Sequence, residues 1–138
     1  MLNILVVDDS LIIRKNIKKY ITNLGHSIAG EAKNGSMAIE QCKDLKPDLI
    51  TMDITMPDMD GITAVKKIRE FNSKTNIIMI TSHGQEEMVV NSLKAGAQGY
   101  LLKPINEEKL AQAIANIYQE YTQDLDDELL DDDELLDD

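Results

Sequence analysis

The sequence contains one cysteine, no tryptophan, one phenylalanine and three prolines in 138 residues. A single cysteine excludes an intramolecular disulfide framework and a cysteine-rich metal site. Cys42 lies in the apolar stretch "MAIEQC", which favours a small buried side chain over a reactive thiol. There is no run of about 18 apolar residues, so we predict no membrane-spanning helix. The start "MLNILVVDD" reaches two aspartates too early for a secretory signal, and we expect a cytoplasmic protein.

Basic side chains are scarce relative to acidic ones, with 14 Lys and Arg against 25 Asp and Glu, and the net charge is −11. The acidic excess is local, because 10 of the acidic residues lie in "DLDDELLDDDELLDD" at 124–138, which has no basic residue. Residues 1–123 are therefore almost neutral. Binding to the phosphates of nucleic acid requires a basic face, and none is evident, so we expect no nucleic acid partner.

Short apolar segments alternate with segments of helical period along residues 1–121. Five apolar segments are candidate strands, and some are nearly continuous, as in strands covered on both faces: residues 3–7, 27–32, 48–52, 76–80 and 99–102. Apolar residues at helical spacing follow each of them and predict five helices: Ile13, Ile17, Ile21 and Leu24; Met37 or Ala38, with Cys42 and Leu45; Ile62, Val65 and Ile68; Val89, Leu93 and Ala97; Leu110, Ile114, Ile117 and Tyr121.

This alternation predicts a single α/β domain with a parallel sheet and helices on both faces. For five such units we expect the flavodoxin-like, doubly wound strand order 2-1-3-4-5, with a crevice outside the carboxyl ends of strands one and three. Polar side chains stand at the ends of four strands: Asp8 and Asp9, Asp53, Thr81 and Ser82, and Lys103. We therefore expect these side chains to share one edge of the sheet.

Three carboxylates at one sheet edge repel one another by roughly 1 to 4 kcal/mol per pair, so a cation is expected among them. Oxygen ligands with room for water suit Mg²⁺ better than zinc. Thr81 can donate to a phosphoryl oxygen and Lys103 can neutralise another, which predicts a phosphoryl site with Asp53 as the acceptor. Lys103 must then point back into the crevice although Pro104 follows it, and a cis Lys103–Pro104 peptide bond is the simplest way to make that turn.

The motifs "VVDDS", "TMDITMPDMDG", "IIMITS", "LKAGA" and "LLKP" occur in this order and at fitting spacings. Through them, residues 1–121 resemble the response-regulator receiver domains of two-component signalling, of the single-domain chemotaxis type. The resemblance implies that Asp53 accepts a phosphoryl group from a histidine kinase in a Mg²⁺-dependent reaction. It also implies that Asp9, Asp53 and the backbone carbonyl of Thr55 bind the metal, with Asp8 acting through a metal-bound water.

The same resemblance assigns Thr81 and Lys103 to the phosphoryl oxygens and makes Thr81 and Tyr100 a switch. In the family, the aromatic at the Tyr100 position turns inward when Thr81 moves to the phosphoryl group. This change remodels the surface of the fourth helix, fifth strand and fifth helix, where a partner is expected to bind. Thr55 and His83 occupy positions that tune phosphoryl lifetime in the family.

Such a protein is a phosphoacceptor that assists its own phosphotransfer and dephosphorylation, and we do not expect an enzyme acting on other substrates. We expect a monomer that meets a histidine kinase, a phosphatase and, as output, a flagellar motor switch protein. A phosphorelay intermediate is one alternative. A phosphorylation-independent scaffold is another, although it would be expected to lose acidic or lysine positions, and none is lost. An aspartyl-phosphate phosphohydrolase would resemble Asp-x-Asp, but Thr55 stands where the second acid would be.

The acidic tail at 122–138 leaves two interpretations open. Like charges four residues apart disfavour a helix and favour a disordered tail that aids solubility. However, Leu125, Leu129 and Leu136 fall within about 40° of one another on a helical wheel, so a folded tail would present an apolar stripe. The second interpretation is an acidic-leucine motif that folds on a basic partner surface with an apolar groove.

Overall fold

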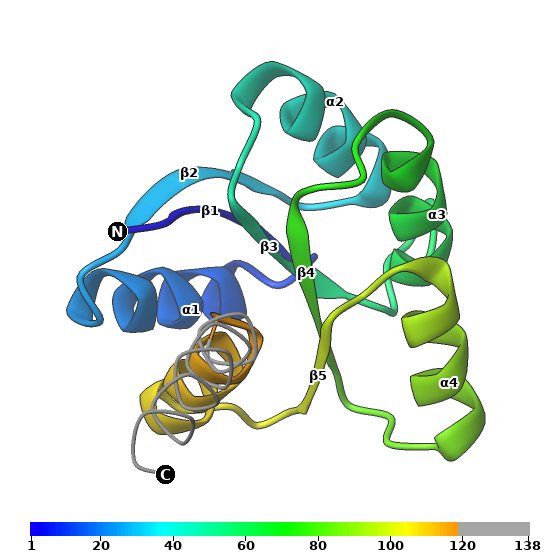
Figure 1. Ribbon diagram of the computed structural model, residues 1–138. Coiled ribbons are helices and arrows are strands. Elements are labelled where there is room, and N and C mark those ends of the chain that lie inside the picture. Colours follow the sequence, from blue (N-terminus) through cyan, green and yellow to red (C-terminus); the bar gives the residue numbers. More distant parts are fainter. Residues whose placement is uncertain (119–138) are drawn as a thin grey trace, which may run out of the picture.

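The computed structural model describes residues 1–118, so the acidic tail and Tyr121 lie outside the described residues. Strands and helices alternate along this part of the chain (Figure 1). The elements are β1 (Asn3–Val7), α1 (Leu11–Asn23), β2 (Ser27–Ala32), α2 (Gly35–Leu45), β3 (Leu49–Asp53), α3 (Gly61–Phe71), β4 (Asn76–Thr81), α4 (Glu86–Ala95) and β5 (Gly99–Leu102). A helical segment at 107–118 follows β5. No helix within residues 1–118 is long and apolar enough to cross a membrane.

The strands form one parallel sheet in the order β2-β1-β3-β4-β5, which confirms the predicted topology. Three of the five predicted strands have the observed bounds. The predicted strand at 48–52 is displaced by one residue, since β3 itself ends in Asp53. Val7 of β1 pairs with Met52 of β3, so the residues that follow them, Asp8 and Asp53, leave the sheet side by side.

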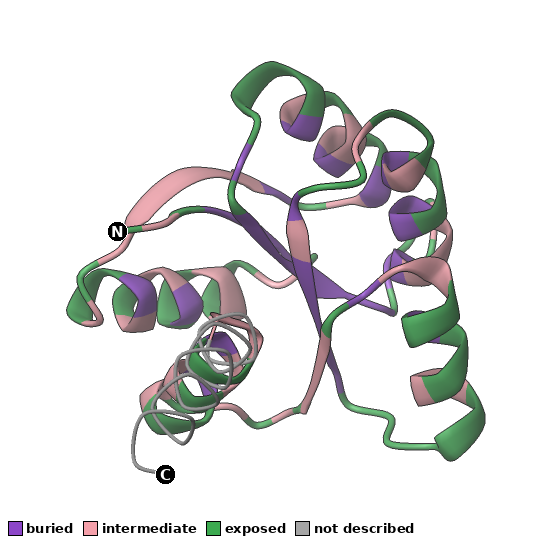
Figure 2. Cartoon of the chain, viewed as in Figure 1, coloured by how far each residue is buried: buried purple, intermediate pink, exposed green. Residues whose placement is uncertain are grey.

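Helices cover both faces of the sheet, and each face has its own apolar core. On one face, residues of α2, α3 and α4 pack against β3 side chains such as Ile50 and Met52. On the other, α1 and the segment 107–118 pack against β1 and β4 through residues such as Ile17 and Leu110. Figure 2 shows the buried residues concentrated in the central strands and on the inner sides of the helices. Cys42 belongs to the first core and is buried, as predicted.

Side-chain caps fix where several helices begin. The N-cap side chains of α1, α2 and α3 are Ser10, Asn34 and Asp60, and each accepts a hydrogen bond from a backbone N–H of its helix's first turn. Asn106 does the same for the segment 107–118, accepting from the Lys109 N–H at 2.8 Å. Such caps satisfy donors that have no partner within the helix. The loops that lead into α1, α2, α3 and the segment 107–118 are thereby fixed at their helical ends, whereas the N-cap of α4, Gln85, makes no such bond.

The inward face of α4 differs from the prediction. The expected apolar positions were Val89, Leu93 and Ala97. Ala97 is buried in the first core, although it lies beyond the end of the helix, but Leu93 is 48% exposed. Ser92 is the buried residue of α4 instead. Its hydroxyl donates to the Met88 carbonyl oxygen at 2.9 Å, so the polar group is satisfied within the helix and can face inward. Apolar periodicity could not identify a face that is built around a serine.

Candidate functional site

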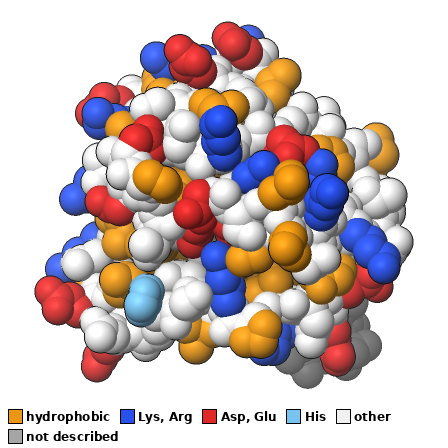
Figure 3. All heavy atoms as spheres, turned by 180° about the vertical axis from the view of Figure 1, so that it is seen from behind, with side chains coloured by type: hydrophobic (Ala, Val, Ile, Leu, Met, Phe, Trp, Pro, Cys, Tyr) orange, Lys and Arg blue, Asp and Glu red, His pale blue; other side chains and the backbone are white. Residues whose placement is uncertain are grey.

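The three predicted carboxylates meet at the carboxyl edge of the sheet. Asp8, Asp9 and Asp53 each offer an oxygen, and these three atoms lie within 4.8 Å of one another. Asp8 and Asp53 are 1% and 3% exposed, whereas Asp9 is exposed. From behind, acidic and basic side chains meet near the middle of the molecule, among apolar ones (Figure 3). The predicted convergence of these aspartates is confirmed.

Lys103 follows β5 and reaches back to the same carboxylates. Its ammonium nitrogen lies 3.0 Å from Asp8 Oδ2 and 3.4 Å from Asp53 Oδ1. The backbone N–H of Lys103 donates to the Thr81 carbonyl oxygen at 2.7 Å, which fixes the end of β5 against the end of β4. The Lys103–Pro104 peptide bond is cis, as predicted.

The electrostatics of the site favour additional positive charge. Burial, together with the charge of Asp8, raises the pKa of Asp53 to about 7 even though Lys103 acts in the opposite direction. Burial alone would lower the pKa of Lys103, but its hydrogen bond to Asp8 and the charge of Asp53 outweigh burial and raise it. One ammonium group therefore does not balance the buried carboxylates completely.

The donor set fits a hard divalent cation. The available side-chain ligands are carboxylate oxygens, which Mg²⁺ prefers, and the exposed Asp9 leaves the cluster open to water. Asp8, Asp9 and Asp53 are the residues that would hold such an ion. Thr55 lies on the loop after β3 with its side chain exposed, and the metal-binding role of its backbone carbonyl stays a prediction.

Thr81 and Tyr100 both contact the loop between β4 and α4. Thr81 is buried at the end of β4, and its hydroxyl oxygen accepts a hydrogen bond from the His83 N–H at 3.2 Å. Tyr100 of β5 is partly exposed, and its hydroxyl donates to the carbonyl oxygen of His83. The backbone of His83 thus connects the two side chains that the sequence predicts to act together.

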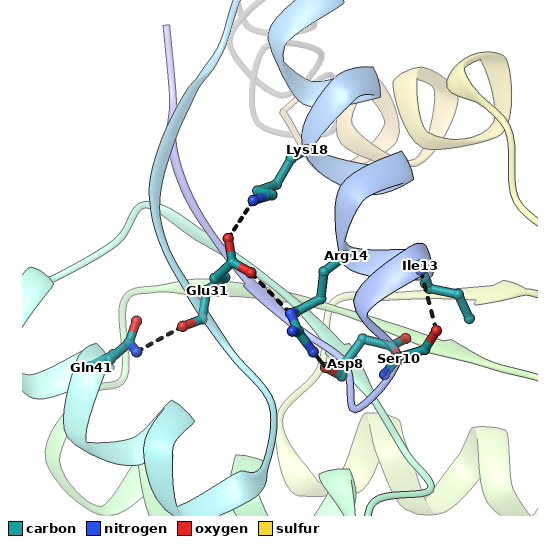
Figure 4. Close-up of polar contacts among 7 residues, drawn as sticks. All are labelled: Asp8, Ser10, Ile13, Arg14, Lys18, Glu31 and Gln41. Atoms are coloured by element: carbon teal, nitrogen blue, oxygen red, sulfur yellow. Dashed lines mark hydrogen bonds and ion pairs between the residues drawn. The ribbon is translucent and has the colours of Figure 1, made fainter.

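A network behind Asp8 holds the turn after β1 in place (Figure 4). Asp8 Oδ1 accepts from the Ser10 N–H at 2.9 Å, and Arg14 Nη1 donates to the Asp8 carbonyl oxygen at 2.7 Å. Arg14 also pairs with Glu31 at 3.0 Å, and Lys18 pairs with the other oxygen of Glu31. Sequence reasoning missed this network because no spacing motif connects α1 with a residue of β2.

Gly61 fixes the backbone at Asp53 from the other side. Its N–H donates to the Ile54 carbonyl oxygen at 2.7 Å. A Cβ atom at this position would lie 2.1 Å from the Asp53 carbonyl oxygen, a distance that no side chain tolerates. The start of α3 can approach β3 this closely because residue 61 is glycine. Gly61 closes the "DMDG" turn, but no sequence motif predicted its contact with the Asp53 carbonyl.

Comparison with known proteins agrees with this geometry. Residues 4–115 match the model of the response regulator receiver domain. The chain is 42% identical over 114 residues to the chemotaxis protein CheY of Thermotoga maritima, covering 83% of this chain and 95% of that protein. It is 43% identical over 111 residues to CheY of Bacillus subtilis, covering 80% and 92%.

Solved structures give the same result. The structure of the CheX-CheY-BeF3-Mg²⁺ complex from Borrelia burgdorferi contains a chain that is similar to this one with a TM-score of 0.82 and 36% identity. The match covers 84% of this chain and 88% of that chain. The strand order is the predicted one, three aspartates meet at the carboxyl edge of the sheet, and the family model matches most of the chain. The chain therefore belongs to the response regulator receiver domain family.

Proposed function

We propose that this chain is a phosphorylation-dependent switch, with residues 1–121 as the receiver domain and 122–138 as a separate tail. Asp53 accepts a phosphoryl group from a histidine kinase in a Mg²⁺-dependent reaction. The observation that carries the proposal is the position of Asp53, buried at the end of β3, 3.4 Å from the Lys103 ammonium and grouped with two further carboxylates. No structural role requires such an arrangement, because burying like charges together is costly.

In the proposed transfer, a carboxylate oxygen of Asp53 forms a bond to phosphorus while the bond between phosphorus and the histidine nitrogen breaks. The bonding electrons stay with the imidazole, which leaves and takes up a proton. Lys103 and the Thr81 hydroxyl bind the phosphoryl oxygens and orient the group. Mg²⁺ held by Asp9, Asp53 and the Thr55 carbonyl, with Asp8 acting through water, would supply positive charge for these oxygens.

The proposed switch follows from the contacts of Thr81. Donating to a phosphoryl oxygen reorients the Thr81 hydroxyl, which accepts from the His83 N–H in the structure described above. The Tyr100 hydroxyl donates a hydrogen bond to the carbonyl oxygen of His83. A shift of the loop between β4 and α4 therefore changes the position of Tyr100. The affected surface comprises α4, β5 and the segment 107–118.

The relatives support chemotaxis as the pathway. Proteins named chemotaxis protein CheY are similar to nearly the whole described chain. By its name, the Borrelia structure contains a CheY with a beryllofluoride group and Mg²⁺, bound to CheX. For this chain we propose a cytoplasmic monomer that meets a histidine kinase and a phosphatase and acts on a flagellar motor switch protein.

Acetyl phosphate with Mg²⁺ tests the acceptor directly. Wild-type protein should gain the mass of one phosphoryl group, and Asp53→Asn should gain none. Asp58→Asn is the matched control, because Asp58 is an exposed aspartate of the same loop and should leave labelling unchanged. Full labelling of Asp53→Asn would remove the proposal. Absence of labelling in the wild type would favour the phosphorylation-independent scaffold.

A binding assay tests the output. Immobilised protein, with and without beryllofluoride and Mg²⁺, is offered a purified flagellar motor switch protein or a purified histidine phosphotransfer domain. We expect beryllofluoride to increase retention of the motor protein. Retention of the phosphotransfer domain, with none of the motor protein, would instead indicate a phosphorelay intermediate.

A further inference from the structure

A second recess lies at the amino ends of the strands, opposite the edge that carries Asp53. It has a volume of about 560 Å³ and is bordered by Leu2, Asp48 and Asn76, which stand at the starts of β1, β3 and β4. The loops after α2 and α3 form its walls. We call it the amino-end recess. Its lining includes Lys43, Lys46, Pro47, Phe71, Lys74 and Tyr118.

The amino-end recess combines positive charge with an apolar floor. Lys43, Lys46 and Lys74 are all exposed, and Phe71 is a large apolar side chain that is 42% exposed. The Lys43 ammonium lies 5.0 Å from the centre of the Phe71 ring. The acidic member of the recess, Asp48, already accepts a hydrogen bond from the Asn3 N–H at 2.8 Å. The recess therefore presents three cations beside an exposed aromatic ring.

The backbone at Lys46 is unusual. This residue ends α2 with φ of 47°, in the left-handed region where glycine is favoured. Glycine would adopt this backbone conformation with less strain, but the residue here is a lysine with a long charged side chain. This turn places Lys46 among the lining residues of the amino-end recess.

The described part of the chain ends beside this recess. Tyr118, the last described residue, lines the recess, and its hydroxyl accepts a hydrogen bond from Asn76 Nδ2 at 3.0 Å. Residues 122–138 contain 10 acidic residues, five leucines and no basic residue. Seventeen residues can span up to about 60 Å when extended, so the tail is long enough to return to the recess.

We propose that the acidic tail of this chain docks in the amino-end recess. Its carboxylates pair with Lys43, Lys46 and Lys74, and its leucines lie against the exposed ring of Phe71. Because the tail begins four residues after Tyr118, its effective concentration at the recess is in the millimolar range, and weak contacts suffice. The docked tail leaves the Asp53 edge open, and the proposal is independent of whether Asp53 is phosphorylated.

Carbodiimide cross-linking of the full chain tests the proposal, since this reagent joins carboxylates to amines that are in contact. We expect cross-links from the tail to Lys43, Lys46 or Lys74 at low ionic strength, located by mass spectrometry. About 1 M salt should suppress them, because screening then acts within about 3 Å. A mixture of ¹⁵N-labelled and unlabelled protein distinguishes links within one chain from links between chains.

Two matched triple variants sharpen the test. Lys43, Lys46 and Lys74 are changed to Gln in one, and the exposed residues Lys15, Lys19 and Lys67 are changed to Gln in the other. The recess variant should lower the equilibrium constant for docking about tenfold, as expected for three weak ion pairs, and should shift the tail amides in NMR spectra. The control variant, with the same net charge, should leave these amides unchanged.

A third variant tests the apolar contact between the tail leucines and Phe71. Changing Leu125, Leu129 and Leu136 to Ser keeps every charge of the tail but should shift the amides of Phe71 and its neighbours. Equal effects of the two lysine variants, cross-links to lysines elsewhere, or links solely between chains would each overturn docking within the chain. An absence of cross-links at low ionic strength would overturn it too, and would return the tail to a solubilising role.

Discussion

Lys103 shares one ammonium group between two buried carboxylates, and Lys103→Met separates the roles of charge and packing. The methionine has a similar length, but Asp8 and Asp53 then lack their cation. Without metal we expect the free energy of unfolding to fall by about 3 kcal/mol. Because Mg²⁺ can replace the lost positive charge, it should stabilise this variant more than the wild type.

Urea denaturation with and without Mg²⁺ measures this difference. Lys94→Met, which removes an exposed ammonium from α4, is the control and should respond to Mg²⁺ as the wild type does. An equal Mg²⁺ response of Lys103→Met and wild type would contradict the electrostatic interpretation of the site.

Arg14 and Lys18 both pair with Glu31, but Arg14 alone of these two also donates to the Asp8 carbonyl oxygen. Arg14→Gln should therefore loosen the turn that carries Asp8 and Asp9, and weaken Mg²⁺ binding by about tenfold, as is common for groups that support metal ligands. Lys18→Gln should leave the affinity nearly unchanged. Calorimetric titration with Mg²⁺ compares the two, and similar losses in both variants would show that Arg14 has no positioning role.

At the scale of elements, the junction between β3 and α3 depends on a glycine. In Gly61→Ala the new methyl group would meet the Asp53 carbonyl oxygen, and the backbone must move. We expect a loss of about 2 kcal/mol in the free energy of unfolding together with slower labelling of Asp53 by acetyl phosphate. Gly30→Ala is the control, because its methyl group would meet the ends of the flexible side chains of Gln41 and Leu45. Labelling at the wild-type rate in Gly61→Ala would mean that Asp53 does not depend on this contact.

The pairing of α1 with β2 through Glu31 makes part of the stability depend on pH. Hydrogen bonds from Lys18 and Arg14 lower the pKa of Glu31 below its ordinary value of 4.5. A lowered folded-state pKa means that the stabilisation is complete above 4.5 and is lost as the pH falls through the folded-state value. Because Glu31 is partly exposed, the contribution is about 0.5 to 1 kcal/mol.

Comparison of wild type with Glu31→Gln isolates this contribution from other carboxylates. The difference in free energy of unfolding between the two proteins should be present at about pH 7 and be smaller at about pH 3, because the stabilisation declines as the pH falls below 4.5. Urea denaturation at both values measures it. If the difference in free energy of unfolding were the same at the lower pH, the effect of Glu31→Gln would be due to packing and not to charge.

The elements show which features the sequence could predict. Continuous apolar runs such as 76–80 identify buried strands, and the parallel order then brings Asp8, Asp53 and Lys103 together without further information. The inward face of α4 could not be predicted, because Ser92 satisfies its hydroxyl on the helix backbone. The contact of Arg14 with Asp8 was equally hidden, since it depends on the three-dimensional turn after β1.

At the scale of the whole molecule, charge is divided between the folded part and the tail. Residues 1–118 contain 14 acidic and 14 basic side chains, so the formal charge of the described fold is zero. The entire net charge of −11 arises from residues 119–138. Partners that bind the fold through local charge therefore meet a balanced surface beside a strongly acidic segment.

The uneven burial of the elements has a consequence for how the molecule opens. Every residue of β3 is buried, whereas α4 buries a single side chain. Amide hydrogens of β3 should therefore exchange with solvent through global unfolding, and those of α4 through local opening at much lower free energy. Exchange followed by mass spectrometry would contradict this if α4 and β3 were protected equally. The helix expected to change on activation can then fray and re-form many times while the strand that ends in Asp53 stays closed.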